Sequence, residues 1–257
     1  MIQLLHSILA VMYREYKIRT TSMTWILFDL AVPMFYLLVF GIGFNNAFTG
    51  GVIVEGVTVD YNSFFLAGVL SMTGFGIAIN SSYGFFMDRD NGIFYEILSY
   101  PMTRGEFLIG KIIFNGCITT LQAALTIFIG VLVLRIEIVY AYLPLLLFAN
   151  LYSAAGWFFF LSIFALRIRR NDFYNTIINL LYFILMFASS LFFPLDSSPL
   201  WLKIIAYGNP LTWNTDVLRY LSIGIGNPSH VLFEMIGYVI FSIGAFIAGI
   251  HALKHSA

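Results

Sequence analysis

The sequence predicts an all-α integral membrane protein with six transmembrane helices, built as one domain over residues 1–257. Hydrophobic residues make up 60% of the chain and charged residues 10%, whereas soluble domains hold roughly 45–50% apolar and about 25% charged residues. The mean hydropathy is +0.88. A soluble fold could not bury this much apolar surface. The 13 basic and 13 acidic residues cancel, so no overall field favours nucleic acid as a partner.

An interfacial helix is expected over residues 1–20, before the first span. Apolar residues recur there every four positions, opposite polar ones: Leu4, Ile8, Met12 and Tyr16 against His6, Arg14 and Lys17. This pattern is typical of a helix that lies in the membrane surface. An amphipathic extension of the first span is the alternative.

Six later segments are long and apolar enough to cross the bilayer, which takes about 20 residues. They run near Thr24 to Phe44, Phe64 to Met87, Phe107 to Leu134, Tyr140 to Leu166, Phe173 to Phe193 and Val231 to Ala252. With the N-terminus inside, only Arg135, Lys203 and Arg219 of the 13 basic residues fall on outer segments. Basic residues concentrate in cytoplasmic loops. We therefore expect a multi-pass protein of the cell (inner or plasma) membrane with both termini cytoplasmic.

Two short helices are expected at residues 194–228, before the last span. Ser198 can cap a helix from Pro199 to Tyr207, with Gly208 as a left-handed stop, and a second helix should cover Leu211 to Leu221. The first helix would be roughly 14 Å long, too short to span. The pair either dips back into the outer leaflet as re-entrant helices or forms a surface loop with two amphipathic turns.

No catalytic or metal-binding arrangement is expected in this chain. Gly105 to Lys111 has the spacing of a phosphate-binding loop, but Ile112 stands where a hydroxyl must hold magnesium and no strand precedes it. His251 and His255 lie one helical turn apart without a third ligand nearby. Cys117 is the single cysteine, which rules out an intrachain disulfide.

Asp29 is the ionisable residue singled out within the first span. Inserting a charged side chain at the centre of a transmembrane helix costs about 2.5 to 3.5 kcal/mol unless the group is paired or hydrated. Pairing with Lys17 or Arg19 is one interpretation, and a role in a translocation path is the other.

The charged segment at residues 88–106, between the second and third spans, is expected in the cytoplasm. Its helical pattern sets an apolar stripe, Ile93, Phe94, Ile97 and Leu98, beside the charges Asp88, Arg89, Asp90 and Glu96. A stripe with flanking charges is suited to docking a soluble partner. The alternative is that the stripe packs on the chain's own span ends.

Motifs along nearly the whole chain have the order found in one transporter family. They are Arg14-Glu15, Pro33 with Phe40-Gly41-Ile42-Gly43, Asp88 to Gly92 before Glu96-Ile97-Leu98, and Asn209-Pro210-Leu211-Thr212 to Arg219. The chain thereby resembles type-2 ATP-binding-cassette (ABC) exporter permeases. The resemblance implies a half-channel completed by a second copy, so that a homodimer is expected. It also implies that two cytoplasmic nucleotide-binding subunits bind ATP and magnesium. The ATPase activity is then expected in those subunits and not in this chain. The coupling helix that contacts them is expected at Asp88 to Ser99.

The resemblance is strongest to the drug-exporting and lipo-oligosaccharide-exporting branch, so an amphipathic or hydrophobic substrate is expected. A polysaccharide or lipo-oligosaccharide exporter is the alternative, and an ATPase-independent secondary transporter is a second one. Polar residues of three spans are the candidates for the substrate path: Tyr36, Asn80, Tyr83, Asn179, Tyr182 and Ser189. Hydrogen bonds between helices are the alternative role for each of them.

Overall fold

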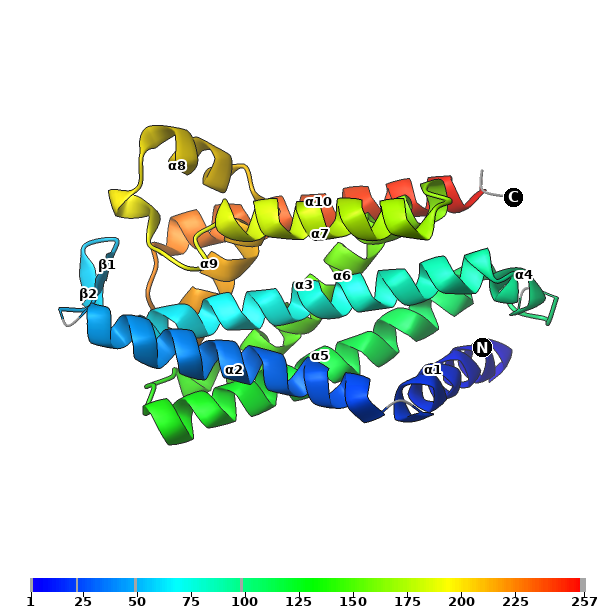
Figure 1. Cartoon of the computed structure of the whole chain (residues 1–257), viewed down its shortest axis with the longest axis horizontal. Coiled ribbons are helices and arrows are strands. Elements are labelled where there is room, and N and C mark those ends of the chain that lie inside the picture. Colours follow the sequence, from blue (N-terminus) through cyan, green and yellow to red (C-terminus); the bar gives the residue numbers. More distant parts are fainter. Residues whose placement is uncertain (1, 22, 49, 98, 255–257) are drawn as a thin grey trace.

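The computed structural model describes residues 2–21, 23–48, 50–97 and 99–254 as a bundle of long helices (Figure 1). The elements in chain order are α1 (Ile2–Thr21), α2 (Met23–Ala47), β1 (Val52–Val54), β2 (Val57–Val59), α3 (Tyr61–Asp90), α4 (Ile93–Ile97), α5 (Arg104–Leu134), η1 (Tyr140–Tyr142), α6 (Leu143–Arg167), α7 (Asn171–Phe187), η2 (Leu195–Ser197), α8 (Leu200–Tyr207), α9 (Pro210–Ile223) and α10 (Pro228–Lys254). Both chain termini and α4 lie at one end of the bundle, the α4 end, and β1, β2 and α8 lie at the other, the hairpin end.

Five of these helices are long and apolar enough to cross a membrane, within the described residues: α2 from Leu27, α3, α5, α6 together with η1, and α10. The central helix is α3, which packs on α2, α5, α6 and α9 and is buried along most of its length. Helices α2 and α10 instead expose large apolar side chains such as Phe35 and Phe233, as expected beside lipid. The chain is thus a helical integral membrane protein, as the composition predicts.

The predicted fifth span is shorter in the structure than in the sequence analysis. Helix α7 has 17 residues and ends at Phe187, whereas the apolar run continues to Phe193. The chain leaves the helix at Ala188, and the next two residues, Ser189 and Ser190, are buried. Hydropathy alone could not detect this exit from the helix.

A two-stranded hairpin between α2 and α3 departs from the all-α prediction. Strands β1 and β2 pair antiparallel with Val52 opposite Val59 and Val54 opposite Val57. The turn residues Glu55 and Gly56 have φ of 48° and 81°, and positive φ at both positions is the backbone of a tight two-residue hairpin turn. The alternating valines around Glu55-Gly56 are the sequence signal for this hairpin.

The two short helices before α10 are present, but their predicted caps are partly wrong. Helix α8 begins at Leu200 without a side-chain cap, because the Ser198 hydroxyl instead donates to the carbonyl of Pro194 at 3.4 Å. Gly208 has φ of −83° and is not left-handed. The left-handed stop is Gly224, with φ of 74°, at the end of α9.

Local capping sets where α3 begins, at the hairpin end, and where α5 begins, at the α4 end. The Asp60 carboxylate accepts from the backbone N–H of Ser63 and starts α3. A reciprocal pair of hydrogen bonds between Thr103 and Glu106 starts α5. The residues with phosphate-loop spacing, Gly105 to Lys111, are therefore the first turns of a helix, and they do not form a phosphate-binding loop.

Candidate functional site

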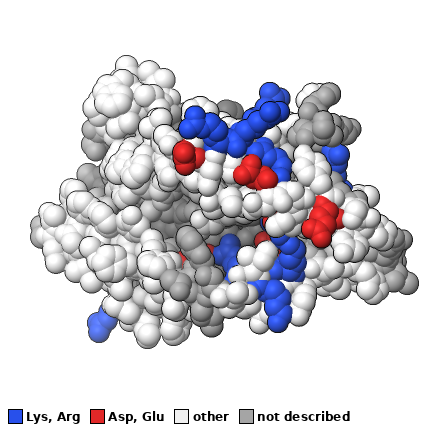
Figure 2. All heavy atoms as spheres, turned by 45° about the vertical axis from the view of Figure 1, so that its right-hand side comes forward, with Lys and Arg blue, Asp and Glu red and all other residues white. Residues whose placement is uncertain are grey.

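Charged side chains gather at the α4 end of the molecule (Figure 2). They come from α1, from the C-terminal end of α3 with α4, from the start of α5 and from the connection between α6 and α7. These segments are far apart in sequence, so the bundle is what brings them to one end.

Helix α4 is fixed to the ends of α3 and α5 by Phe94. This ring is 1% exposed, and its centroid lies 5.4 Å from that of Phe85 and 5.5 Å from that of Phe107. Gly92, with φ of 76°, makes the turn that brings α4 back onto the bundle. Phe94 is therefore not presented to a partner. For this residue, packing on the chain's own span ends is the interpretation that the structure supports.

Asp88 and Arg89 also point into the molecule. The Asp88 side chain is 8% exposed and forms ion pairs with α1 and α5. The Arg89 guanidinium donates to the carbonyls of Ala165 and Ile168, the latter at 2.6 Å, and so joins α3 to the end of α6. On the outside, Asp90, Tyr95 and Glu96 are exposed, and Ile93 and Ile97 are half-buried. Leu98 lies outside the described residues.

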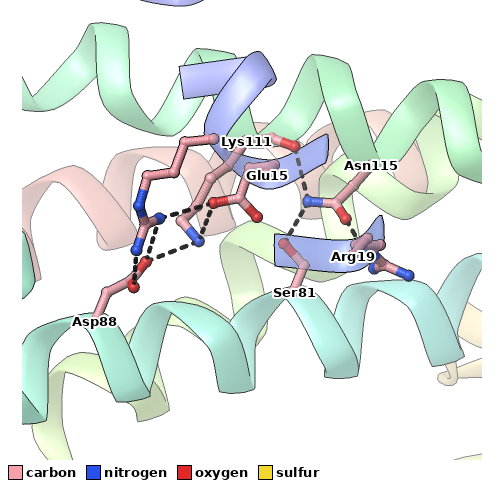
Figure 3. Close-up of polar contacts among 7 residues, drawn as sticks. Glu15, Arg19, Ser81, Asp88, Lys111 and Asn115 are labelled. Atoms are coloured by element: carbon pink, nitrogen blue, oxygen red, sulfur yellow. Dashed lines mark hydrogen bonds and ion pairs between the residues drawn. The ribbon is translucent and has the colours of Figure 1, made fainter. Parts of the chain in front are cut away.

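A charge cluster, formed by Arg14, Glu15, Asp88 and Lys111, joins α1, α3 and α5 (Figure 3). Lys111 of α5 has a side chain 2% exposed, and its ammonium lies 2.8 Å from the Glu15 carboxylate and 2.9 Å from that of Asp88. Arg14 bonds both carboxylates, at 3.0 Å to Glu15 and 3.1 Å to Asp88. Two cations thus face two anions, and the cluster is neutral.

The pKa of Arg14 reflects this environment. Burial by itself lowers it, but the hydrogen bond and charge of Asp88, together with Glu15, outweigh burial, so the pKa is raised. Gly110 lets α1 come close enough for these contacts, because a Cβ there would lie 2.7 Å from that of Val11. The cluster therefore holds α1 firmly against α3 and α5.

A chain of polar contacts continues from the cluster toward the middle of the bundle. The Asn115 amide donates to Ser81 at 2.6 Å and accepts from Arg19 at 3.3 Å (Figure 3). Arg19 in turn forms an ion pair with Asp29. Of the two partners expected for Asp29, Lys17 and Arg19, the structure shows Arg19.

Asp29 also lines a cleft of about 280 Å³, the Asp29 cleft, between α2, α3, α5 and α7. Three predicted path residues, Tyr36, Asn80 and Tyr182, lie on its wall. The Asn80 amide donates to the Asp29 carboxylate at 3.0 Å. Gln122 of α5 donates to the backbone carbonyl of Asp29. Sequence reasoning missed Gln122, although a glutamine in a predicted span is the same kind of signal as Asn80.

The other three predicted path residues lie outside the Asp29 cleft. Tyr83 is half-buried, and its hydroxyl accepts from Asn171 at 3.5 Å. Asn179 is exposed on α7 and donates to the carbonyl of Asn175. Ser189 is fully buried and donates to the carbonyl of Met186. Its contact is a local hydrogen bond just past the end of α7.

Comparison with known proteins supplies a context for this geometry. Residues 6–223 match the sequence model of a family described as ABC-2 type transporter. The chain is 27% identical over 231 residues to the protein named "Putative transport permease ycf38" of Cyanophora paradoxa, a match covering 81% of this chain and 78% of the relative. It is 26% identical over 204 residues to the protein of the same name in Pyropia yezoensis, covering 74% of this chain and 64% of the relative.

Proposed function

We propose that this chain, which belongs to the ABC-2 type transporter family, is the permease subunit of an exporter driven by ATP hydrolysis in a separate nucleotide-binding subunit. Family membership makes the chain a membrane transport permease. The proposal adds a direction, outward, and a substrate class, amphipathic or hydrophobic molecules such as drugs or lipids.

The observation that carries the proposal is the anchoring of α4. Phe94 is buried between Phe85 and Phe107, and Asp88 is held by the charge cluster. A short helix whose buried side is packed on α3 and α5 in this way can transmit force from a bound subunit to these two helices. Docking itself then falls to the outward residues: Asp90, Ile93, Tyr95, Glu96 and Ile97. Asp88, Arg89 and Phe94 position this surface and do not contact the partner.

The proposed topology has six spans, with α7 as the fifth and α8 and α9 as re-entrant helices on the outer side. Support comes from the common end shared by α4 and both termini (Figure 1) and from the basic residues that concentrate there. Helix α1 buries Val11 and Glu15 while Leu4 and Tyr16 stay exposed, which suits a helix lying in the cytoplasmic membrane surface.

The Asp29 cleft is the proposed substrate path within one permease. Apolar side chains such as Val32 and Met72 share its wall with Tyr36 and Asn80, and a mixed lining suits an amphipathic molecule. Asn80, in the wall of the cleft, is exposed in the single chain. A second copy of the chain would close it, so we propose a homodimer with two ATPase subunits.

The docking proposal is tested by reversing one charge on α4. The permease is coexpressed with its candidate cytoplasmic ATPase, and copurification is compared for the wild type, Glu96→Lys and the control Glu137→Lys. Glu137 is exposed near the hairpin end, between α5 and η1. We expect at least tenfold less ATPase with Glu96→Lys, about 1.4 kcal/mol of binding free energy, and no loss with Glu137→Lys. Equal copurification of all three proteins would remove α4 from the docking surface, and a permease that binds no ATPase would favour a secondary transporter.

A further inference from the structure

A small pocket of about 60 Å³, the Glu234 pocket, lies at the hairpin end, where the β1–β2 turn, η2, α9 and α10 meet. One water molecule needs about 10–15 Å³ of such space, so the pocket has room for a few waters or for one small polar group. Its charged and titratable lining consists of Glu55, Asp196, Tyr207, Asp216, Glu234, Arg219 and His230. Four carboxylates thus face a single guanidinium and one imidazole, and the excess charge is negative.

Glu234 is the unusual member of this lining. Its side chain is 2% exposed, and neither carboxylate oxygen has a hydrogen bond within the described residues. The Nδ1 atom of the His230 imidazole lies 3.9 Å from Oε1 of Glu234, beyond hydrogen-bond length. A buried carboxyl group without hydrogen bonds is costly, and no described residue supplies one to Glu234.

Arg219 is already committed to other partners. Its guanidinium forms an ion pair with Asp216, donates to the carbonyl of Ser190 at 2.8 Å and lies 4.1 Å from the ring centroid of Phe64. Asp216 also accepts from the Ser190 hydroxyl at 2.7 Å. Arg219 and Asp216 therefore pair with each other, and neither oxygen of the Glu234 carboxyl group has a hydrogen-bond partner within the described residues.

We propose that the Glu234 pocket binds a primary ammonium group that donates hydrogen bonds to the Glu234 carboxylate. The negative lining disfavours an anion. A metal ion is disfavoured because no group of three His, Cys, Asp or Glu side chains, among the described residues, could hold one. A primary ammonium is compact and carries three donors, which suits the volume. The proposal does not depend on ATP-driven export, because binding can be measured on the permease alone.

The test measures thermal unfolding of the purified full-length permease in phosphatidylcholine nanodiscs, in amine-free phosphate buffer. Methylammonium chloride is the probe, and sodium chloride and tetramethylammonium chloride at equal concentration are the controls, because neither cation carries an N–H donor. A ligand that binds only the folded state raises the unfolding midpoint in a saturable way. We expect that rise with methylammonium alone, in the wild type and in Glu137→Gln, and its loss in Glu234→Gln.

Several results would overturn the proposal. Equal rises of the unfolding midpoint with all three salts would mean charge screening. A rise with calcium chloride but not with methylammonium chloride would mean a metal site. An unchanged midpoint of the wild type with methylammonium chloride would mean that the pocket holds water only. These readings need no variant, so they stand even if Glu234→Gln folds poorly.

The source of the ammonium group is identified by adding phosphatidylethanolamine to the nanodiscs. If this lipid raises the midpoint and abolishes the methylammonium effect, the ligand is a lipid headgroup. If the methylammonium effect persists unchanged, the ligand is a soluble amine. Both results support ammonium binding at Glu234.

Discussion

The two ends of the molecule both bury charged side chains, but they do so in opposite ways. At the α4 end, Lys111 lies within 2.9 Å of two carboxylates, and the charge cluster contains two cations and two anions. At the hairpin end, Arg219 forms an ion pair with Asp216, and Glu234 has no hydrogen bond within the described residues. A matched cluster acts as a joint between helices, whereas an unmatched carboxylate marks a place for a ligand.

The largest effect is expected from breaking the matched cluster. Lys111→Met leaves Glu15 and Asp88 buried with only Arg14 as a partner, and loss of one member of a buried ion pair costs about 3–5 kcal/mol. Unfolding of the purified permease by denaturant or heat measures this. Lys17→Met is the control, because Lys17 is exposed on α1 and should change stability by less than about 0.5 kcal/mol. Equal stability of the two variants would show that the cluster is not a structural joint.

A smaller effect is expected at Asp29, where Asn can keep part of the hydrogen bonding. Asp29→Asn removes the charge that pairs with Arg19 but retains an acceptor for Asn80, so about 1–3 kcal/mol of stability should be lost. Because Asp29 lines the Asp29 cleft, transport per folded molecule should fall as well. Both quantities are measured on protein quantified after purification. Intact transport with reduced expression would limit Asp29 to structural pairing with Arg19.

The smallest effect on stability is expected at the unmatched end. Glu234→Gln keeps the size of the side chain and breaks no hydrogen bond within the described residues, so in amine-free phosphatidylcholine nanodiscs the unfolding free energy should change by less than about 1 kcal/mol. The same unfolding assay used for Lys111→Met measures it. A loss as large as that of Lys111→Met would mean that the Glu234 charge is compensated inside the chain.

Much of the fold could be predicted because it depends on local hydropathy. The predicted second span, Phe64 to Met87, lies within α3, and the third, Phe107 to Leu134, lies within α5. The partner of Asp29 could be predicted in part, because the sequence indicates Lys17 or Arg19 and the structure shows Arg19, ten residues away. Local sequence determines helices and near neighbours, and these parts of the prediction are confirmed.

The parts that could not be predicted depend on contacts between distant residues. Lys111 is read from the sequence as an inner basic residue, yet its partners lie 96 and 23 positions away, at Glu15 and Asp88. Phe94 belongs to an apolar stripe by pattern, and only the bundle shows that it is covered by Phe85 and Phe107. Glu234 was detectable, because it is an acidic residue within the predicted last span, the same signal that singled out Asp29.

The proposal that α4 couples this permease to an ATPase is tested most directly by the ATPase rate of the assembled pair. ATP hydrolysis by the candidate ATPase is measured alone, with the wild-type permease, and with the Glu96→Lys and Glu137→Lys variants, all in nanodiscs. We expect the wild type and Glu137→Lys to change the rate of the ATPase equally, and Glu96→Lys to abolish this change. A rate that is the same with the wild type and with Glu96→Lys would contradict it.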